Sequence, residues 1–138
     1  MAYTHTQYEV DLVAGASFAS TGDKGEYAPG YIPHIIRAVA VVCKTNPAGG
    51  GVLKLDKRPT AGSDTNRGDG DVAVVNIPDG AQGDVIYVDG LNEELKPGEE
   101  VVAQVTTADA GLTDADIKLY VEPRWEQPGN IAAMKESS

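Results

Sequence analysis

Few residues in this sequence could do chemistry, and their spacing fits no common catalytic arrangement. Nucleophilic catalysis needs a nucleophile, a base and a third group that orients the base. The sequence holds two histidines, His5 and His34, as candidate imidazole bases. Ser17 lies in the run GASFA, which lacks the final glycine of the nucleophile elbow G-x-S-x-G. We therefore expect a protein that is not an enzyme.

Oxygen ligands are concentrated in residues 64–71, which read DTNRGDGD. A calcium loop of the EF-hand type needs a bidentate acid at its twelfth position, and that position here is Val75. Arg67 would also place a positive charge among the ligands. The glycines of this run precede an apolar strand-like segment, whereas a dinucleotide-binding fingerprint requires a helix there. We expect a solvated loop and no bound metal or cofactor.

Cys43 is the single cysteine, so it cannot form an intramolecular disulfide. It ends the apolar run AVAVVC, and a free cysteine in such a run usually behaves as a small buried hydrophobe. A reactive thiol would instead need exposure and a cationic neighbour.

The charge of the chain limits its partners. The formal net charge is −10, and residues 93–138 alone carry ten acids against four bases. Such a chain repels phosphate backbones, so we expect no direct binding of nucleic acid. The first residues lack the features of a signal peptide, and no apolar run reaches the roughly 18 residues of a membrane span. We expect a soluble protein with no membrane partner.

The apolar residues are arranged as in a protein built of short strands. Glycine and proline, 16 and 8 residues in all, separate segments rich in valine and isoleucine. We expect about seven strands and no long amphipathic helix, with a short helical turn over residues 109–116. The expected strands cover residues 8–13, 35–43, 52–57, 71–77, 84–88, 100–106 and 117–122. This pattern predicts an all-β fold, either a β-sandwich of jelly-roll-like type or a small β-barrel.

Three parts of the chain differ in character. Residues 1–30 are predicted to form an N-terminal strand and a flexible N-terminal arm, because the stretch after residue 13 is small and polar with weak periodicity. Residues 31–130 are predicted to form the β-sandwich domain. Residues 131–138 are predicted to form a C-terminal tail.

Three runs of the sequence resemble those of a known family. Residues 58–64, 96–108 and 122–130 read RPTAGSD, KPGEEVVAQVTTA and EPRWEQPGN. Together they resemble small head proteins of tailed bacteriophages, described as capsid decoration, cement or stabilisation proteins. The resemblance covers roughly residues 31–130 and consists of turn and strand patterns rather than a catalytic signature.

This resemblance implies a structural protein of the virion, made in the host cytoplasm and bound to the outer surface of the capsid. Its expected partner is the major capsid protein, whose neighbouring copies it would bridge. A homo-oligomer is also implied, with a trimer favoured and a dimer possible. An N-terminal arm of such proteins can order against the capsid surface.

Aromatic and basic residues are the candidates for capsid or oligomer contacts, because such residues often carry the binding energy of interfaces. Trp125 could instead hold the C-terminal segment on the sandwich, or stack against a sugar together with tyrosines. The alternative function is therefore a binding module on the virion surface, such as a head fibre or a glycan adhesin. The candidate contact residues are Tyr3, His5, Tyr8, Phe18, Tyr27, Tyr31, Arg124 and Trp125.

Overall fold

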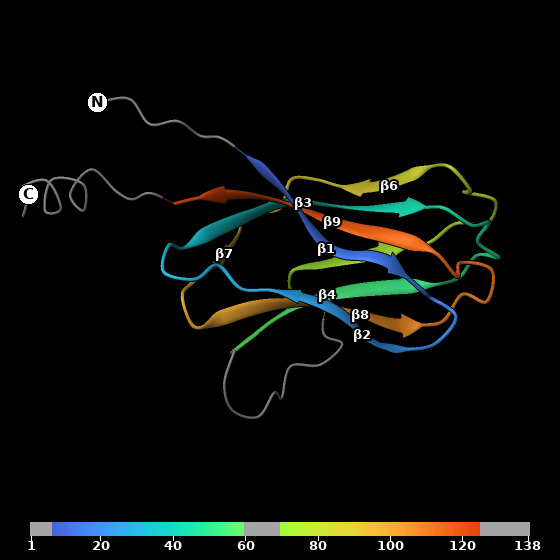
Figure 1. Cartoon of the computed structure of the whole chain (residues 1–138), viewed down its shortest axis with the longest axis horizontal. Helices are drawn as coiled ribbons and strands as arrows, with labels where there is room; N and C mark the ends of the chain where they lie inside the picture. The colour runs from blue at the N-terminus through green and yellow to red at the C-terminus, as the bar shows by residue number, and fades with distance from the viewer. Residues whose placement is uncertain (1–6, 60–69, 125–138) are drawn as a thin grey trace, which may run out of the picture.

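The computed structural model describes residues 7–59 and 70–124 of the 138-residue chain (Figure 1). These residues form nine strands and no helix. The strands are β1 (Tyr8–Ala16), β2 (Gly22–Tyr27), β3 (His34–Cys43), β4 (Val52–Pro59), β5 (Ala73–Asn76), β6 (Val85–Val88), β7 (Glu93–Leu95), β8 (Glu99–Thr107) and β9 (Ala115–Pro123).

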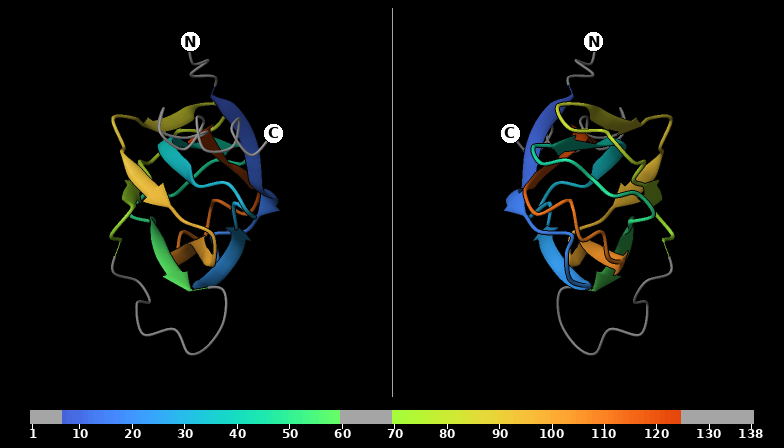
Figure 2. Two further views of the ribbon diagram at one scale, coloured as in Figure 1. Left: turned by 90° about the vertical axis from the view of Figure 1, so that its left-hand side faces the viewer. Right: turned by 90° about the vertical axis from the view of Figure 1, so that its right-hand side faces the viewer.

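The strands form two antiparallel sheets that pack face to face (Figure 2). One sheet has the order β1-β9-β3-β6, with β7 also paired to β3, and the other has the order β2-β8-β4-β5. The sheets do not close into a barrel. The all-β prediction and the β-sandwich are therefore confirmed, and the small barrel is wrong.

The connectivity is that of a jelly roll. Strands pair as in one long folded hairpin, with β1 on β9, β2 on β8, β3 on β6 and β7, and β4 on β5. Rolling this hairpin brings β3 beside β9 and β4 beside β8. The result is the double-sheet arrangement of jelly rolls.

The core lies between the two sheets and follows the alternation of the strands. In β9, Ile117, Leu119 and Val121 are buried, while Lys118 and Tyr120 between them face outward and are partly exposed. Such a period of two is what a strand with one buried face requires. Figure 1 shows the two layers of strands, with β1, β9, β3 and β6 above β2, β8 and β4.

The segment expected to be an arm is part of the sandwich from residue 8 to residue 27. β1 pairs with β9 in one sheet and β2 pairs with β8 in the other. Phe18, between these strands, is fully buried, and its backbone N–H donates to the carbonyl of Leu112 at 2.8 Å. The burial of Phe18 and its backbone hydrogen bonds to residues 109 and 112 explain why a small, polar stretch is held in place. Residues 1–6 and the expected tail, 131–138, lie outside the described residues.

The loops at the Phe18 end of the sandwich meet at the buried carboxylate of Asp109. Its Oδ1 atom accepts backbone N–H groups of Ala48 at 2.8 Å, Gly111 at 3.0 Å and Leu112 at 3.3 Å. Its Oδ2 atom accepts the N–H of Gly49 at 2.9 Å. Residues 109–116, expected to form a short helical turn, form a non-helical turn around this carboxylate and then enter β9.

Candidate functional site

The end of the sandwich opposite Asp109 gathers the beginnings of β1 and β3 with the ends of β2 and β9. Tyr8 is in register with Val121. His34 is in register with Pro123, and its ring lies 6.0 Å from that of Tyr27 in an edge-to-face contact. We call this region the tyrosine end and define it by Tyr8, Tyr27, Tyr31, His34 and Arg124.

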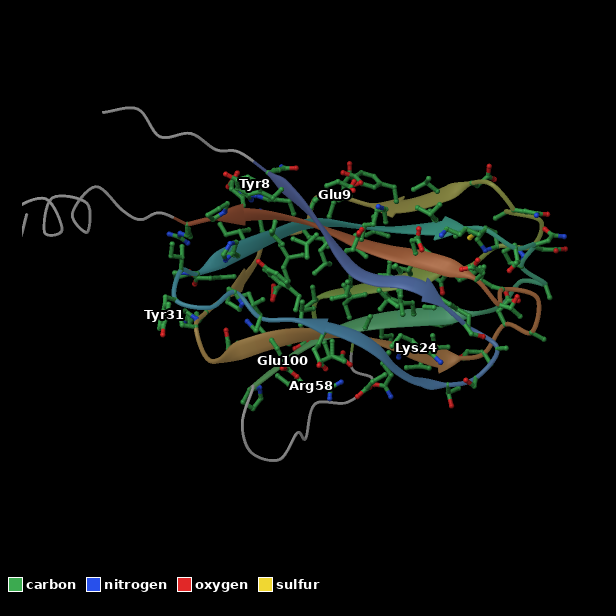
Figure 3. The ribbon with its side chains drawn as sticks, in the orientation of Figure 1. Tyr8, Glu9, Lys24, Tyr31, Arg58 and Glu100 are labelled. Atoms are coloured by element: carbon green, nitrogen blue, oxygen red, sulfur yellow. The ribbon has the colours of Figure 1, made fainter. Side chains whose placement is uncertain are left out.

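Tyr31 is the most exposed side chain of the tyrosine end. It lies at the tip of the connection between β2 and β3, where 98% of its surface is accessible to solvent (Figure 3). Gly30 before it has a φ of 78°, a left-handed conformation that glycine adopts without strain. The connection therefore presents the ring of Tyr31 away from the sandwich.

Polar contacts hold the rest of the tyrosine end in place. The backbone N–H of Arg124 donates to the carbonyl of Pro33 at 2.8 Å, and its guanidinium lies 3.5 Å from the carboxylate of Glu94. Nδ1 of His34 lies 2.8 Å from the carbonyl oxygen of Ile32. Burial raises the pKa of the Tyr27 hydroxyl, which stays protonated at neutral pH.

The structure places four of the predicted contact residues at one end of the sandwich and buries a fifth in the core. Tyr8, Tyr27, Tyr31 and Arg124 all lie at the tyrosine end. Phe18 is a core residue at the other end and offers no surface to a partner. Tyr3, His5 and Trp125 lie outside the described residues.

A second candidate surface, which the sequence analysis did not predict, covers the outer face of the β1-β9-β3-β6 sheet. Tyr87 on β6 and Tyr120 on β9 make an edge-to-face contact, with ring centroids 5.8 Å apart and an angle of 71°. In register between them, β3 presents Ala40 opposite Tyr87 and Ala38 opposite Tyr120. Both alanines are buried although they face outward, because small residues there let the rings lie across the sheet.

Charged neighbours fix the position of Tyr120. Its hydroxyl donates to Glu9 at 3.0 Å, and Nζ of Lys118 contacts the carboxylates of Glu9 at 3.2 Å and Asp11 at 3.0 Å. Burial and the Glu9 carboxylate raise the pKa of Tyr120. The pKa of Lys118 is also raised, by its hydrogen bonds to Asp11 and Glu9. Tyr120 is therefore a neutral donor with a fixed ring.

A hollow of about 510 Å³ lies beside this tyrosine pair. Two irregularities of the sheet create it. Arg37 forms a bulge in β3, because the register with β9 shifts between Ile36 and Ala38. The edge strand leaves its register over residues 89–92, between β6 and β7. Side chains that line the hollow include Gln7, Arg37, Tyr87, Asp89, Asn92 and Glu122.

The floor of the hollow is a charge pair with an amide beside it. Nη2 of Arg37 lies 2.6 Å from Oε2 of Glu122, whose side chain is only 9% exposed. Nη1 of Arg37 donates to Oδ1 of Asn92. Bulges commonly redirect a side chain next to a binding site, and here the bulge places the guanidinium between these two partners. The arrangement can donate and accept hydrogen bonds, but it presents no activated nucleophile.

Residues 7–59 and 70–124 offer no metal site and no membrane-spanning helix. No group of three or more His, Cys, Asp or Glu side chains is placed there to hold a metal ion. The part of the chain that the structure describes also has no helix long and apolar enough to cross a membrane. Most of the acidic loop at residues 64–71 lies outside this part.

Comparison of the chain with protein-family models and with curated protein sequences finds no match.

Proposed function

We propose that this protein is a structural virion protein, a decoration or cement protein that binds the outside of a bacteriophage capsid through its tyrosine end. The observation that carries the proposal is the exposed Tyr31 at the tip of an end that also holds Tyr8, Tyr27 and Arg124. The sequence resemblance to phage head proteins supports the same conclusion. Its partner in this proposal is the major capsid protein.

Tyrosine and arginine suit an interface of this kind. Both are enriched among the residues that dominate binding energy. Tyrosine combines a large apolar ring with a hydroxyl, and it has few rotatable bonds to immobilise. A ring that is 98% exposed gains the most from being covered, whereas removing it costs the folded monomer little.

Bridging of neighbouring capsid subunits would arise from repeated weak contacts. A homo-oligomer, with a trimer favoured and a dimer possible, would offer two or three tyrosine ends to the lattice. The second contact then forms at a high effective concentration, so modest single contacts add up to durable attachment. Binding only to the assembled shell would stabilise that state by mass action.

The proposal is tested by co-sedimentation with capsids assembled from the major capsid protein of the same genome. Tyr31→Ala should weaken binding at least about tenfold, which corresponds to a loss of about 1.4 kcal/mol. Its unfolding midpoint should stay as in the wild type, because the side chain contacts solvent. Val74→Ala is the matched control, since Val74 is 42% exposed on β5, which lies at the opposite edge of the sheet from β2.

Two results would count against the proposal. If the wild-type protein stays in the supernatant at every capsid concentration, the capsid is not its partner. If Tyr31→Ala and Val74→Ala sediment equally with the capsids, the tyrosine end is not the contact surface.

A further inference from the structure

We propose that the hollow between β3, β6 and β9 binds a neutral saccharide unit, with the ring of Tyr87 as its stacking surface. Arg37, Asn92 and Asp89 would hydrogen-bond the hydroxyl groups of the sugar. This site adjoins the tyrosine end at Gln7 but shares no residue with it, and it does not depend on the proposed attachment to a capsid. It would make the outer face of the sheet a glycan-binding surface.

The aromatic part of the site is both open and fixed. Tyr87 is 52% exposed, yet its ring contacts that of Tyr120 edge to face. Tyr120 is in turn held by Glu9 at 3.0 Å. A pyranose ring presents a patch of C–H groups that packs on an aromatic face, and a ring already held in place loses little freedom on binding.

The polar part of the site has the groups that sugar hydroxyls require. A hydroxyl both donates and accepts, so it pairs with planar side chains that offer both kinds of atom. The Asn92 carbonyl accepts from Arg37, which directs its amide group, and Asp89 is an exposed acceptor at the rim. The lining of the hollow is mostly polar, which suits a ligand rich in hydroxyl groups, and Tyr87 supplies the aromatic surface beside it.

The charges around the hollow favour a neutral ligand over an anionic one. Arg37 is the one cation among the described residues that line the hollow. Its guanidinium lies 2.6 Å from the carboxylate of Glu122, which neutralises its charge. Asp89 adds a negative charge, and the whole chain carries −10. A sialylated or sulfated sugar would therefore meet net repulsion.

The size of the hollow agrees with this ligand. Its volume of about 510 Å³ lies within the range of roughly 300–1,000 Å³ that is usual for small-molecule sites. It is large enough for a mono- or disaccharide and open enough for a longer chain to continue into solvent.

The test is a glycan array with the full-length protein, containing neutral, sialylated and sulfated glycans. It is followed by saturation-transfer NMR with free glucose, galactose, mannose and N-acetylglucosamine at millimolar concentration. We expect binding to neutral glycans. Tyr87→Ala should weaken it at least about tenfold, the loss expected for a central aromatic contact, and Tyr87→Phe should retain it.

Two further variants separate the site from the rest of the face. Asn92→Ala should also weaken binding, because it removes an amide without altering the tyrosine pair. Val85→Ala is the matched control, since Val85 is 55% exposed two residues before Tyr87 on the same strand, and it should bind as the wild type does. All variants should show wild-type unfolding cooperativity.

The proposal is overturned if no neutral saccharide binds in either assay, if only anionic glycans bind, or if Tyr87→Ala and Asn92→Ala both bind as the wild type does. Failure here is distinct from failure of the capsid proposal. Tyr87→Ala should still sediment with capsids, and Tyr31→Ala should still bind the saccharide.

Discussion

Replacing Asp109 with alanine removes the shared acceptor of four backbone N–H groups, from Ala48, Gly49, Gly111 and Leu112. Asp109 is 1% exposed, so water cannot easily take the place of the lost carboxylate. At about 1 kcal/mol for each lost bond, the variant should lose roughly 3–5 kcal/mol of its free energy of unfolding. That is a large part of the stability of a small domain.

Asp109→Asn separates the geometry of the site from its charge. The retained carbonyl can occupy the position of Oδ1, which accepts three of the four bonds. The new amide would face the N–H of Gly49, so a donor replaces an acceptor there. We expect a loss of about 1–3 kcal/mol, smaller than that of the alanine variant.

The pH dependence of stability gives an independent check. Burial alone would raise the pKa of Asp109, but its four backbone donors lower it below the usual value of 3.8. A lowered pKa in the folded state contributes stability that is present above the usual pKa and is lost as the pH falls below it. The difference between wild type and Asp109→Asn should therefore shrink in acid below about pH 4.

The free energies of unfolding of these variants are obtained from the midpoint and slope of their urea transitions. Asp89→Ala, at an exposed aspartate, is the control. The reasoning fails if Asp109→Ala is within about 1 kcal/mol of the wild type. It also fails if Asp109→Asn is as unstable as the alanine variant and its difference from wild type is constant with pH.

Two further predictions concern the same end of the molecule. Gly111→Ala should lower the free energy of unfolding by about 3 kcal/mol or more, because its Cβ would lie 2.8 Å from the nitrogen of Ala48 and closer still to the carbonyl oxygen of Asn46. The control Gly80→Ala has open space around its Cβ, so it should lose only the free energy that a left-handed residue costs, and equal losses in urea unfolding would refute the prediction. Cys43 is fully buried, and burial, Asp84 and Asp109 raise its pKa, so a thiol reagent at neutral pH should label it only as fast as the protein opens; rapid labelling of the folded protein would contradict its place in the core.

The strands that alternate or are densely apolar could be predicted from the sequence, because one buried face imposes a period of two. Ile117, Leu119 and Val121 in β9 show this directly. β2, which reads GDKGEY, has no such pattern. It is held by long-range packing: a Cβ on Gly25 would lie 2.5 Å from the carbonyl oxygen of Leu12, so only glycine lets β2 approach β1 this closely.

The prediction that Phe18 contacts a partner was wrong, because it was based on the neighbouring residues alone. Its neighbours are small and polar, which is typical of an exposed segment. Its burial depends on the backbone of Leu112 and Asp109, more than 90 residues away. Contacts between residues so far apart cannot be predicted from the local sequence.

The hollow could not be predicted, for a related reason. Tyr87 and Tyr120 meet because β3 lies between β6 and β9. Arg37 reaches Glu122 and Asn92 because of a bulge that shifts the register by one residue. For the tyrosine end, the sequence indicated Tyr8, Tyr27, Tyr31 and Arg124 as candidate contact residues, but not their shared location, because β2, which ends at Tyr27, has no strand pattern.

Cryo-electron microscopy of capsids incubated with the protein is the most direct test of our proposal that the tyrosine end binds an assembled viral shell. We expect density for the sandwich on the outer surface, with Tyr31 in contact with the major capsid protein and each oligomer touching more than one subunit. Bare capsids at saturating protein concentration, or sandwiches attached with Tyr31 facing solvent, would show that the tyrosine end is not a capsid-binding surface.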